Sequence, residues 1–343
     1  MKNIVMKSLL VFITFVFGSI ITEACDNCGC FMGITPYDNQ SSIGMFYRYS
    51  SFNGYKIGNQ SPEFFPNGRV AAPYSVMHNP NGNSTGTLPV YSKSDYEIYT
   101  AYELRANYFI HQRVELNFIL PYNENKMRYE DKIIHLKSQG DATVLAGYQL
   151  IRQMEMEKKI QQRLVLGAGI KFSTGKHDFR DGDNTRYNFL IQPGTGSYDY
   201  LFYLNYAAAG NKLGLGISSV FKVSNYNDYT EKFTNSNNTG VSVFYKLYKG
   251  NLQLIPSAQL YYEYVKGMMS HGILIANTGS DIAMCGPGLD VYYKNLSLNF
   301  SIQYPVRDKT DSENLSAAGK MVAGLKYNFN QKKYLFHKKD TEK

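Results

Sequence analysis

The chain is built from segments in which apolar and polar residues alternate. Residues 196–224 show this best, because two arms, each with one apolar and one polar face, flank the pair Gly210-Asn211. Side chains on a strand point to opposite faces with period two, and such a pair suits a tight turn, so the stretch predicts a β-hairpin. Each arm has about 12 residues, more than the roughly 5–6 of a soluble strand and close to the roughly 9–11 that cross a bilayer.

The same alternation recurs along the chain and predicts about twelve strands. The expected strands cover residues 41–53, 95–110, 112–121, 140–152, 161–173, 196–208, 212–224, 239–248, 251–264, 283–293, 295–305 and 317–329. Long and short connections alternate between them, as in outer-membrane barrels, which have long loops outside and short turns in the periplasm. The expected fold is therefore all-β, a transmembrane antiparallel up-and-down β-barrel over residues 41–329 with both termini in the periplasm.

Alternation alone does not say which face of a strand points inward, so a soluble all-β sandwich or a pair of soluble barrels is the alternative. Strand length and loop asymmetry favour the membrane, and so do aromatic residues near the strand ends. The chain has 30 Tyr and 20 Phe but no Trp. Its net charge of +8 forms no basic stripe, and we expect no nucleic-acid partner.

Residues 1–24 have the features of a secretory signal peptide. A positive region and an apolar core at 9–21 precede Ala24, which ends a passable cleavage site. A single membrane anchor is the alternative, although the apolar run is short for a span. Cleavage after Ala24 would leave Cys25 as the first mature residue and would permit its lipidation, although Thr22 is a poor residue where lipoprotein signals prefer Leu.

Residues 25–40 follow as a Cys-rich periplasmic segment, long enough to enter the barrel as a plug. Cys25, Cys28 and Cys30 lie within six residues, and thiolates select soft metals such as Cu(I) or Zn(II). Disulfide chemistry is the other interpretation, because the periplasm is oxidising and, with Cys285, the four cysteines allow three full pairings. Cys285 is expected on the lipid face of its strand, unless a bulge at the next glycines changes the alternation.

Charged residues recur on the polar faces of the expected strands. In a barrel these faces enclose the lumen, where charges either brace the wall or line a selective path. The candidate lumen-lining residues are Arg48, Glu103, Arg105, Arg113, Glu115, Lys171, Lys222 and Asp290. An excess of Lys on these faces indicates a weak preference for anionic solutes.

The sequence does not predict an enzyme. No Gly-x-Ser-x-Gly, His-Glu-x-x-His or phosphate-binding loop is present, and the histidines are scattered. The acidic stretch at 177–184 lacks the full ligand spacing of a Ca²⁺ loop, so we expect a solvated outer loop there.

Several short motifs resemble a known family. They are Leu120-Pro121-Tyr122, Gly140-Asp141, Gly147-Tyr148, residues 166–171 with Ser173-Thr174-Gly175-Lys176, residues 192–197 leading into the hairpin at 198–224, Tyr327-Asn328-Phe329, and the Cys-Asp-x-Cys-Gly-Cys start. The chain thereby resembles Gram-negative outer-membrane β-barrels regarded as transporters, akin to the meta-pathway phenol-degradation outer-membrane proteins. The resemblance implies the fold, an outer-membrane location with its lipid, the barrel-insertion machinery as a partner, and a transport role without a defined solute.

Two features depart from that family's pattern. Ser173 stands where the family usually has Pro, and residues 330–343 form a basic tail, expected in the periplasm, where many barrels end on the aromatic residue. The sequence therefore predicts an outer-membrane channel or transporter for a small solute. The alternative is a non-transport barrel whose Cys-rich N-terminus binds Cu or Zn or has a structural role, and no other cofactor is expected.

Overall fold

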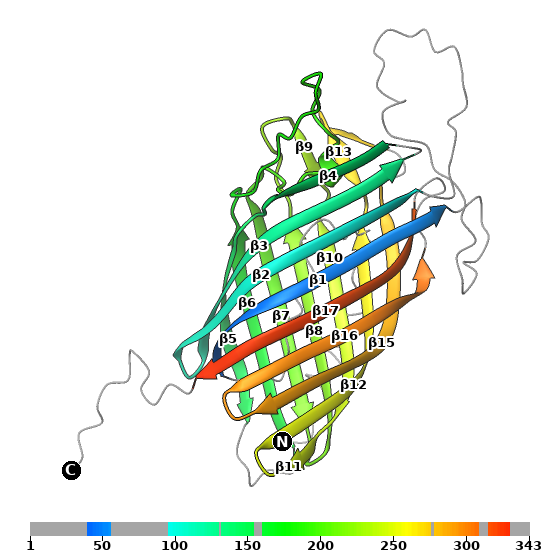
Figure 1. Cartoon of the computed structure of the whole chain (residues 1–343). Helices are drawn as coiled ribbons and strands as arrows, with labels where there is room; N and C mark the ends of the chain where they lie inside the picture. Colours follow the sequence, from blue (N-terminus) through cyan, green and yellow to red (C-terminus); the bar gives the residue numbers. More distant parts are fainter. Residues whose placement is uncertain are drawn as a thin grey trace.

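The computed structural model describes residues 40–55, 95–129, 132–153, 160–275, 278–308 and 315–329. The strands of the wall are β1 (Ser41–Tyr55), β2 (Tyr96–His111), β3 (Val114–Tyr129), β5 (Thr143–Gln153), β6 (Gln161–Lys171), β7 (Asp199–Ala209), β8 (Leu213–Val223), β10 (Ser236–Tyr245), β12 (Leu252–Val265), β15 (Ser280–Tyr293), β16 (Leu296–Asp308) and β17 (Leu315–Phe329). Among the described residues these twelve strands pair in one antiparallel ring (Figure 1). β1 pairs with β17 from Ser41 opposite Phe329 onward, which closes the ring. The predicted fold class is confirmed.

Burial alternates along the strands as the sequence predicts. In β7, Asp199, Leu201 and Tyr203 are buried, whereas Tyr200 and Phe202 are about half exposed. The charged face is thus inside and the apolar face outside, the reverse of a soluble protein. Soluble monomers rarely expose large contiguous apolar patches, so this outer surface is suited to lipid.

Tyrosine side chains gather at both ends of the apolar outer band. At one end Tyr47, Tyr102 and Tyr122 are direct neighbours across β1, β2 and β3, and the ring centroids of Tyr47 and Tyr102 are 5.5 Å apart. Tyr293 and Tyr327 are half exposed at the other end. Aromatic belts of this kind mark the two membrane–water interfaces.

The short turns lie at the end of the barrel where β1 starts and β17 ends, and the long connections lie at the other end (Figure 1). The strands expected at 112–121 and 140–152 leave residues 122–139 as a long loop, and the structure corrects this expectation. β3 continues to Tyr129 and pairs with β4 (Lys132–Gln139), which forms a hairpin beyond the wall. Outward residues change there from apolar to charged while the strand continues, so the sequence looks like a polar loop.

The connections contain further short elements. They are the 3₁₀ helix η3 (Phe189–Ile191), β9 (Glu231–Phe233), β11 (Leu247–Lys249), β13 (Met268–Ser270) and β14 (Ile273–Leu274). β9, β13 and β14 form a separate three-stranded sheet at the end of the long connections (Figure 1). The described part of the chain has no helix of the length and apolarity that a membrane crossing requires.

Candidate functional site

The inner face of the barrel is the candidate site, because buried charges gather there. The eight lumen candidates from the sequence all occupy inward positions of the wall or of its turns and are buried or partly buried. Six of them belong to three ion clusters, and Arg113 and Asp290 lie apart. That these residues line a solute path stays a prediction.

The first ion cluster joins β1 and β2. The Arg48 guanidinium lies 3.1 Å from the Glu103 carboxylate, and Arg105 donates from its Nε to the same carboxylate at 2.7 Å. The Arg105 guanidinium lies over the Phe46 ring, 4.3 Å from its centroid. Glu103 is 4% exposed, whereas the Arg48 and Arg105 side chains keep 13% and 11% of their surface exposed. The cluster thus places two positive groups around one carboxylate.

The second ion cluster joins β3, β6 and β7. Arg163 donates to the Glu115 carboxylate, and the Tyr203 hydroxyl donates to the other carboxylate oxygen at 3.2 Å. Asn117 donates to the Tyr203 hydroxyl at 3.4 Å. The Arg163 and Glu115 side chains are 4% and 1% exposed, so this pair braces the wall. Breaking one partner of such a buried pair typically costs about 3–5 kcal/mol.

The third ion cluster lies near the end of the long connections. The Lys171 ammonium is 3.1 Å from Asp141 and 2.7 Å from Asp199, and the Lys222 ammonium is 3.8 Å from Asp199. Asp141 lies in the break between β4 and β5. All four side chains are 6% exposed or less.

The two other candidates make smaller sets of contacts. Arg113, in the short turn between β2 and β3, donates to the Gln149 carbonyl on β5 at 3.1 Å. Asp290 accepts a hydrogen bond from Asn299 on the neighbouring strand. A further buried pair, Lys320 with Glu263, joins β17 to β12 across the interior.

Residues 172–198, which we name the lid, cross the mouth of the barrel. The Asn125 side chain on β3 donates to the Ile191 carbonyl at 2.9 Å, while Phe189 packs in a cluster with Val265 at the end of β12. β3 and β12 lie half-way round the ring from each other in strand order. η3 at the centre of the lid therefore touches opposite sides of the wall, and its N-terminus is capped by Asn188, which accepts from the Leu190 amide.

Asp141 fastens both ends of the lid to the wall. Its carboxylate accepts from the Gly175 amide at 2.9 Å, from the Thr195 amide at 2.9 Å and from the Thr195 hydroxyl at 2.7 Å. Gly175 and Gly194 lie so close that a Cβ on Gly194 would approach the Gly175 Cα to 2.6 Å. The motif at 192–197 therefore has a structural role, which is to close the lid against β5 and β6.

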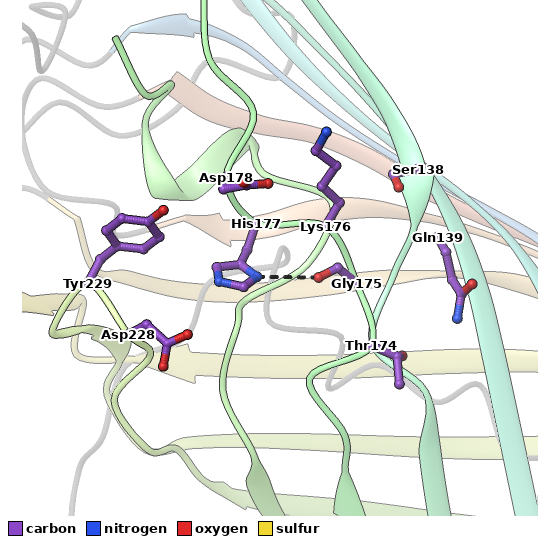
Figure 2. A pocket seen from close by; sticks show the side chains of 9 residues that line it. All are labelled: Ser138, Gln139, Thr174, Gly175, Lys176, His177, Asp178, Asp228 and Tyr229. Atoms are coloured by element: carbon purple, nitrogen blue, oxygen red, sulfur yellow. Dashed lines mark hydrogen bonds between the residues drawn. The ribbon is translucent and has the colours of Figure 1, made fainter. Parts of the chain in front are cut away.

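A polar cavity of about 550 Å³ opens beside the lid (Figure 2). It is lined by Ser138, Gln139, Thr174, Gly175, Lys176, His177, Asp178, Asp228 and Tyr229. The His177 ring lies between Gly175 and Tyr229 (Figure 2), with Nδ1 3.4 Å from the Gly175 carbonyl and the two ring centroids 6.0 Å apart. The cavity carries charges of both signs and forms a vestibule at the end of the long connections.

Alternation places Leu201 and Tyr203 on the polar face of their strand, but it does not predict that apolar side chains pack together inside the barrel. Leu145, Val165, Leu201 and Tyr203 form a buried cluster on the inner wall. An alternating pattern assigns apolar residues to the lipid face, so isolated apolar residues on the polar face look like exceptions. The glycines on β5 and β6 were the available signal, because they leave space for the Tyr203 ring.

The cysteine predictions have different outcomes. Cys25, Cys28 and Cys30 lie outside the described residues, so the metal, the disulfide and the lipid attachment stay predictions. Cys285 is exposed and unpaired among the described cysteines, and alternation runs unchanged through β15, so its side chain faces outward as expected. No group of three or more His, Cys, Asp or Glu side chains suited to a metal occurs in the described part of the chain.

A scan against known protein families finds no match, and neither does a search of curated proteins. Among solved structures, the COG4313 outer membrane channel from Pseudomonas putida F1 superposes with a TM-score of 0.59 at 12% identity, over 86% of this chain and 100% of that chain. The fold is that of a bacterial outer-membrane barrel. The beta domain of the Bordetella autotransporter BrkA has a TM-score of 0.44 at 10% identity, over 85% of this chain and 100% of that one. At these identities the likeness concerns the fold alone.

Proposed function

We propose that the protein is an outer-membrane channel for small solutes. The observation that supports this most is the closed ring of strands with buried charges inside and apolar side chains outside. Such a barrel offers water-soluble solutes a route through lipid that otherwise excludes them. In this proposal the long connections face the outside, the short turns and both chain ends face the periplasm, and the barrel-insertion machinery places the chain in the membrane.

Small side chains on one wall leave room for a solute. Gly240 and Ser242 on β10 and Ser257 on β12 face inward and keep part of their surface exposed. A Cβ on Gly240 would have the Ser218 hydroxyl, 3.0 Å away, as its nearest neighbour. β10 lies opposite β2 in the ring, so this wall faces the first ion cluster. Two guanidinium groups around one carboxylate favour small anions there.

The lid is the gate in this proposal. Its ends are fastened by Asp141, and its centre packs on both sides of the mouth. Passage then requires the lid to move, or a path past it from the vestibule beside His177. A closed resting state keeps the conductance of the wild type low, so a test of channel activity also needs a variant whose lid is loosened.

Planar bilayer recordings test the proposal on the wild type and on Asp141→Ala. We expect ion-permeable steps with a weak anion preference, and a larger open fraction in the variant because the lid loses its fastening. Circular dichroism and heat-modifiable electrophoretic mobility confirm that both proteins are folded. Silence of both folded proteins over a panel of salts, together with no swelling of solute-loaded liposomes, would contradict the channel.

The proposed route has its own test, cysteine accessibility in a background without native cysteines. A negatively charged methanethiosulfonate reagent, which the expected anion preference admits, should react with Ser242→Cys and reduce conductance. Ser297→Cys is the matched control, because Ser297 also faces inward but is 1% exposed. Equal reaction at both positions, or block at Ser297→Cys alone, would place the route elsewhere.

A further inference from the structure

The outer face of β3 changes character within one outward step. On the side toward the short turns, the outward residues of β3 are Leu116, Phe118, Leu120 and Tyr122. The next outward residue is Glu124. Successive outward residues on a strand are about 6.5–7 Å apart. The boundary between lipid tails and headgroups therefore lies between Tyr122 and Glu124 on this side of the barrel, if the membrane placement proposed above holds.

Beyond Glu124, basic side chains dominate the outward positions above that boundary. On β3 these are Lys126 and Arg128, and on β4 they are His135 and Lys137, which pair across the hairpin with Lys126 and Glu124 in register. The Lys137 and His135 side chains are 46% and 37% exposed. Glu130 and Asp131 follow in the sequence, outside the described residues.

These side chains are held in position. The Glu124 carboxylate lies 2.7 Å from the Lys137 ammonium and 2.7 Å from the His135 Nε2. The Lys126 ammonium lies over the Tyr96 ring, 5.7 Å from its centroid. Ammonium groups held by a carboxylate, as in Lys137, and by an aromatic face, as in Lys126, lose less side-chain entropy when they bind an anion.

The basic patch is local to the β3–β4 hairpin. At the matching outward positions of β2, Thr100 and Ile98 stand opposite Glu124 and Lys126, and both are uncharged. β1 continues that neutral surface with Tyr49 opposite Thr100. A general attraction to any anionic surface would need no such concentration on one hairpin.

We propose that this patch binds the phosphate of a phosphorylated lipid in the outer leaflet of the outer membrane. The acyl chains would lie along the apolar outward residues of β2 and β3, the sugar or glycerol against Tyr102 and Tyr122, and the phosphate between Lys126 and Lys137. The patch is continuous with the apolar band, so an amphipathic anion matches it and a fully soluble anion matches only half of it. Ammonium groups at a lipid headgroup act as compact point charges for phosphate.

Binding of bis-phosphorylated lipid A to the purified full-length protein in detergent tests the proposal. The triple variant Lys126→Gln, Arg128→Gln, Lys137→Gln should bind roughly a hundredfold more weakly, because each basic residue at an anionic lipid surface contributes about 1 kcal/mol, or about fivefold. Lys294→Gln is the matched control, since Lys294 also lies over an exposed tyrosine ring, 5.5 Å from the Tyr293 centroid, but at the short-turn end. It should leave binding unchanged.

Two further arms identify the ligand chemistry. Removal of both phosphates from lipid A should greatly weaken its binding to the wild type. The triple variant, which lacks the basic side chains, should bind the lipid with and without phosphates about equally weakly. Inorganic phosphate at millimolar concentration should compete only weakly. Undiminished binding by the folded triple variant, equal binding of the phosphate-free lipid, or full displacement by inorganic phosphate would each overturn the proposal.

Discussion

Wide aromatic rings lie against glycines on the inner wall of the barrel. A Cβ on Gly147 would collide with the Tyr203 side chain, as would one on Gly167. The same relation holds for Phe46 against Gly324 and for Phe244 against Gly214. Glycine in a strand normally weakens it, and here the missing side chain lets a ring lie flat so that it fills less of the lumen.

A double-mutant cycle tests this relation. Gly147→Ala should destabilise the folded barrel by about 1–3 kcal/mol, because the methyl group forces Tyr203 off its rotamer. In a Tyr203→Ala background the same substitution should cost clearly less, because two of the three nearest atoms belong to Tyr203. Urea unfolding in lipid vesicles measures both. Gly240→Ala is the control and should be nearly neutral. If the free-energy costs of Gly147→Ala and Tyr203→Ala simply add in the double variant, the ring and the glycine are independent and the prediction is wrong.

Glu124 is the residue outside the membrane band whose titration is most informative. The hydrogen bond from the Lys137 ammonium lowers the pKa of the Glu124 carboxyl below its ordinary value of 4.5, and the His135 ring acts in the same direction. A lowered folded-state pKa means that the stabilisation is complete above the unfolded-state pKa and is lost as pH falls through the folded-state pKa. The contribution to stability is small, because the groups are exposed.

The pKa of the Glu124 carboxyl can be measured directly. Carbon-13 NMR titration of the Glu124 carboxyl in detergent should give a pKa below 4.5 in the wild type and a higher one in Lys137→Met. Lys132→Met, at the end of the same strand, should leave it unchanged. A midpoint that does not move in Lys137→Met would show that this ion pair does not form.

The lid and the β3–β4 hairpin are the elements that sequence alone could not place. Alternation identifies a strand, but it carries no information on where a long connection folds, and the contacts that hold the lid come from residues far apart in the chain. Asn125 and Val265 are examples, since neither is distinctive in sequence. The motif at 192–197 marked the lid as unusual without showing that it packs on both sides of the mouth.

Fastening of the lid by Asp141 predicts its protease resistance. Asp141→Ala removes three hydrogen bonds to one ionised group, each worth about 1.5–3 kcal/mol. Trypsin cleavage after Lys176 or Arg186 should therefore accelerate at least tenfold, since cleavage follows the population of the opened lid when closing is fast. Asp183→Asn, an exposed change within the same segment, is the control. Equal cleavage rates for Asp141→Ala and the wild type would mean that the lid is held by its apolar contacts alone.

The twelve wall strands in the described part of the chain were predictable because each carries its own signal. Period-two alternation recurs along these wall strands, and the alternation of long and short connections orders them in the ring. The lumen candidates could be predicted from the same alternation, because it assigns charged residues to the inner face. Glu103 and Lys171 are accordingly buried although both are charged. Pairing of charges into clusters was not predictable, because it depends on the stagger between neighbouring strands, which alternation does not specify.

Fluorescence quenching tests the central claim, that the apolar faces of the strands contact lipid and the polar faces enclose the interior. The natural sequence has no Trp, so the variants Phe202→Trp and Tyr203→Trp each carry a single reporter on adjacent, opposite faces of β7. In vesicles of brominated phospholipid, the tryptophan of Phe202→Trp should be strongly quenched and that of Tyr203→Trp almost unaffected. Stronger quenching in Tyr203→Trp, or none in either folded variant, would contradict the account.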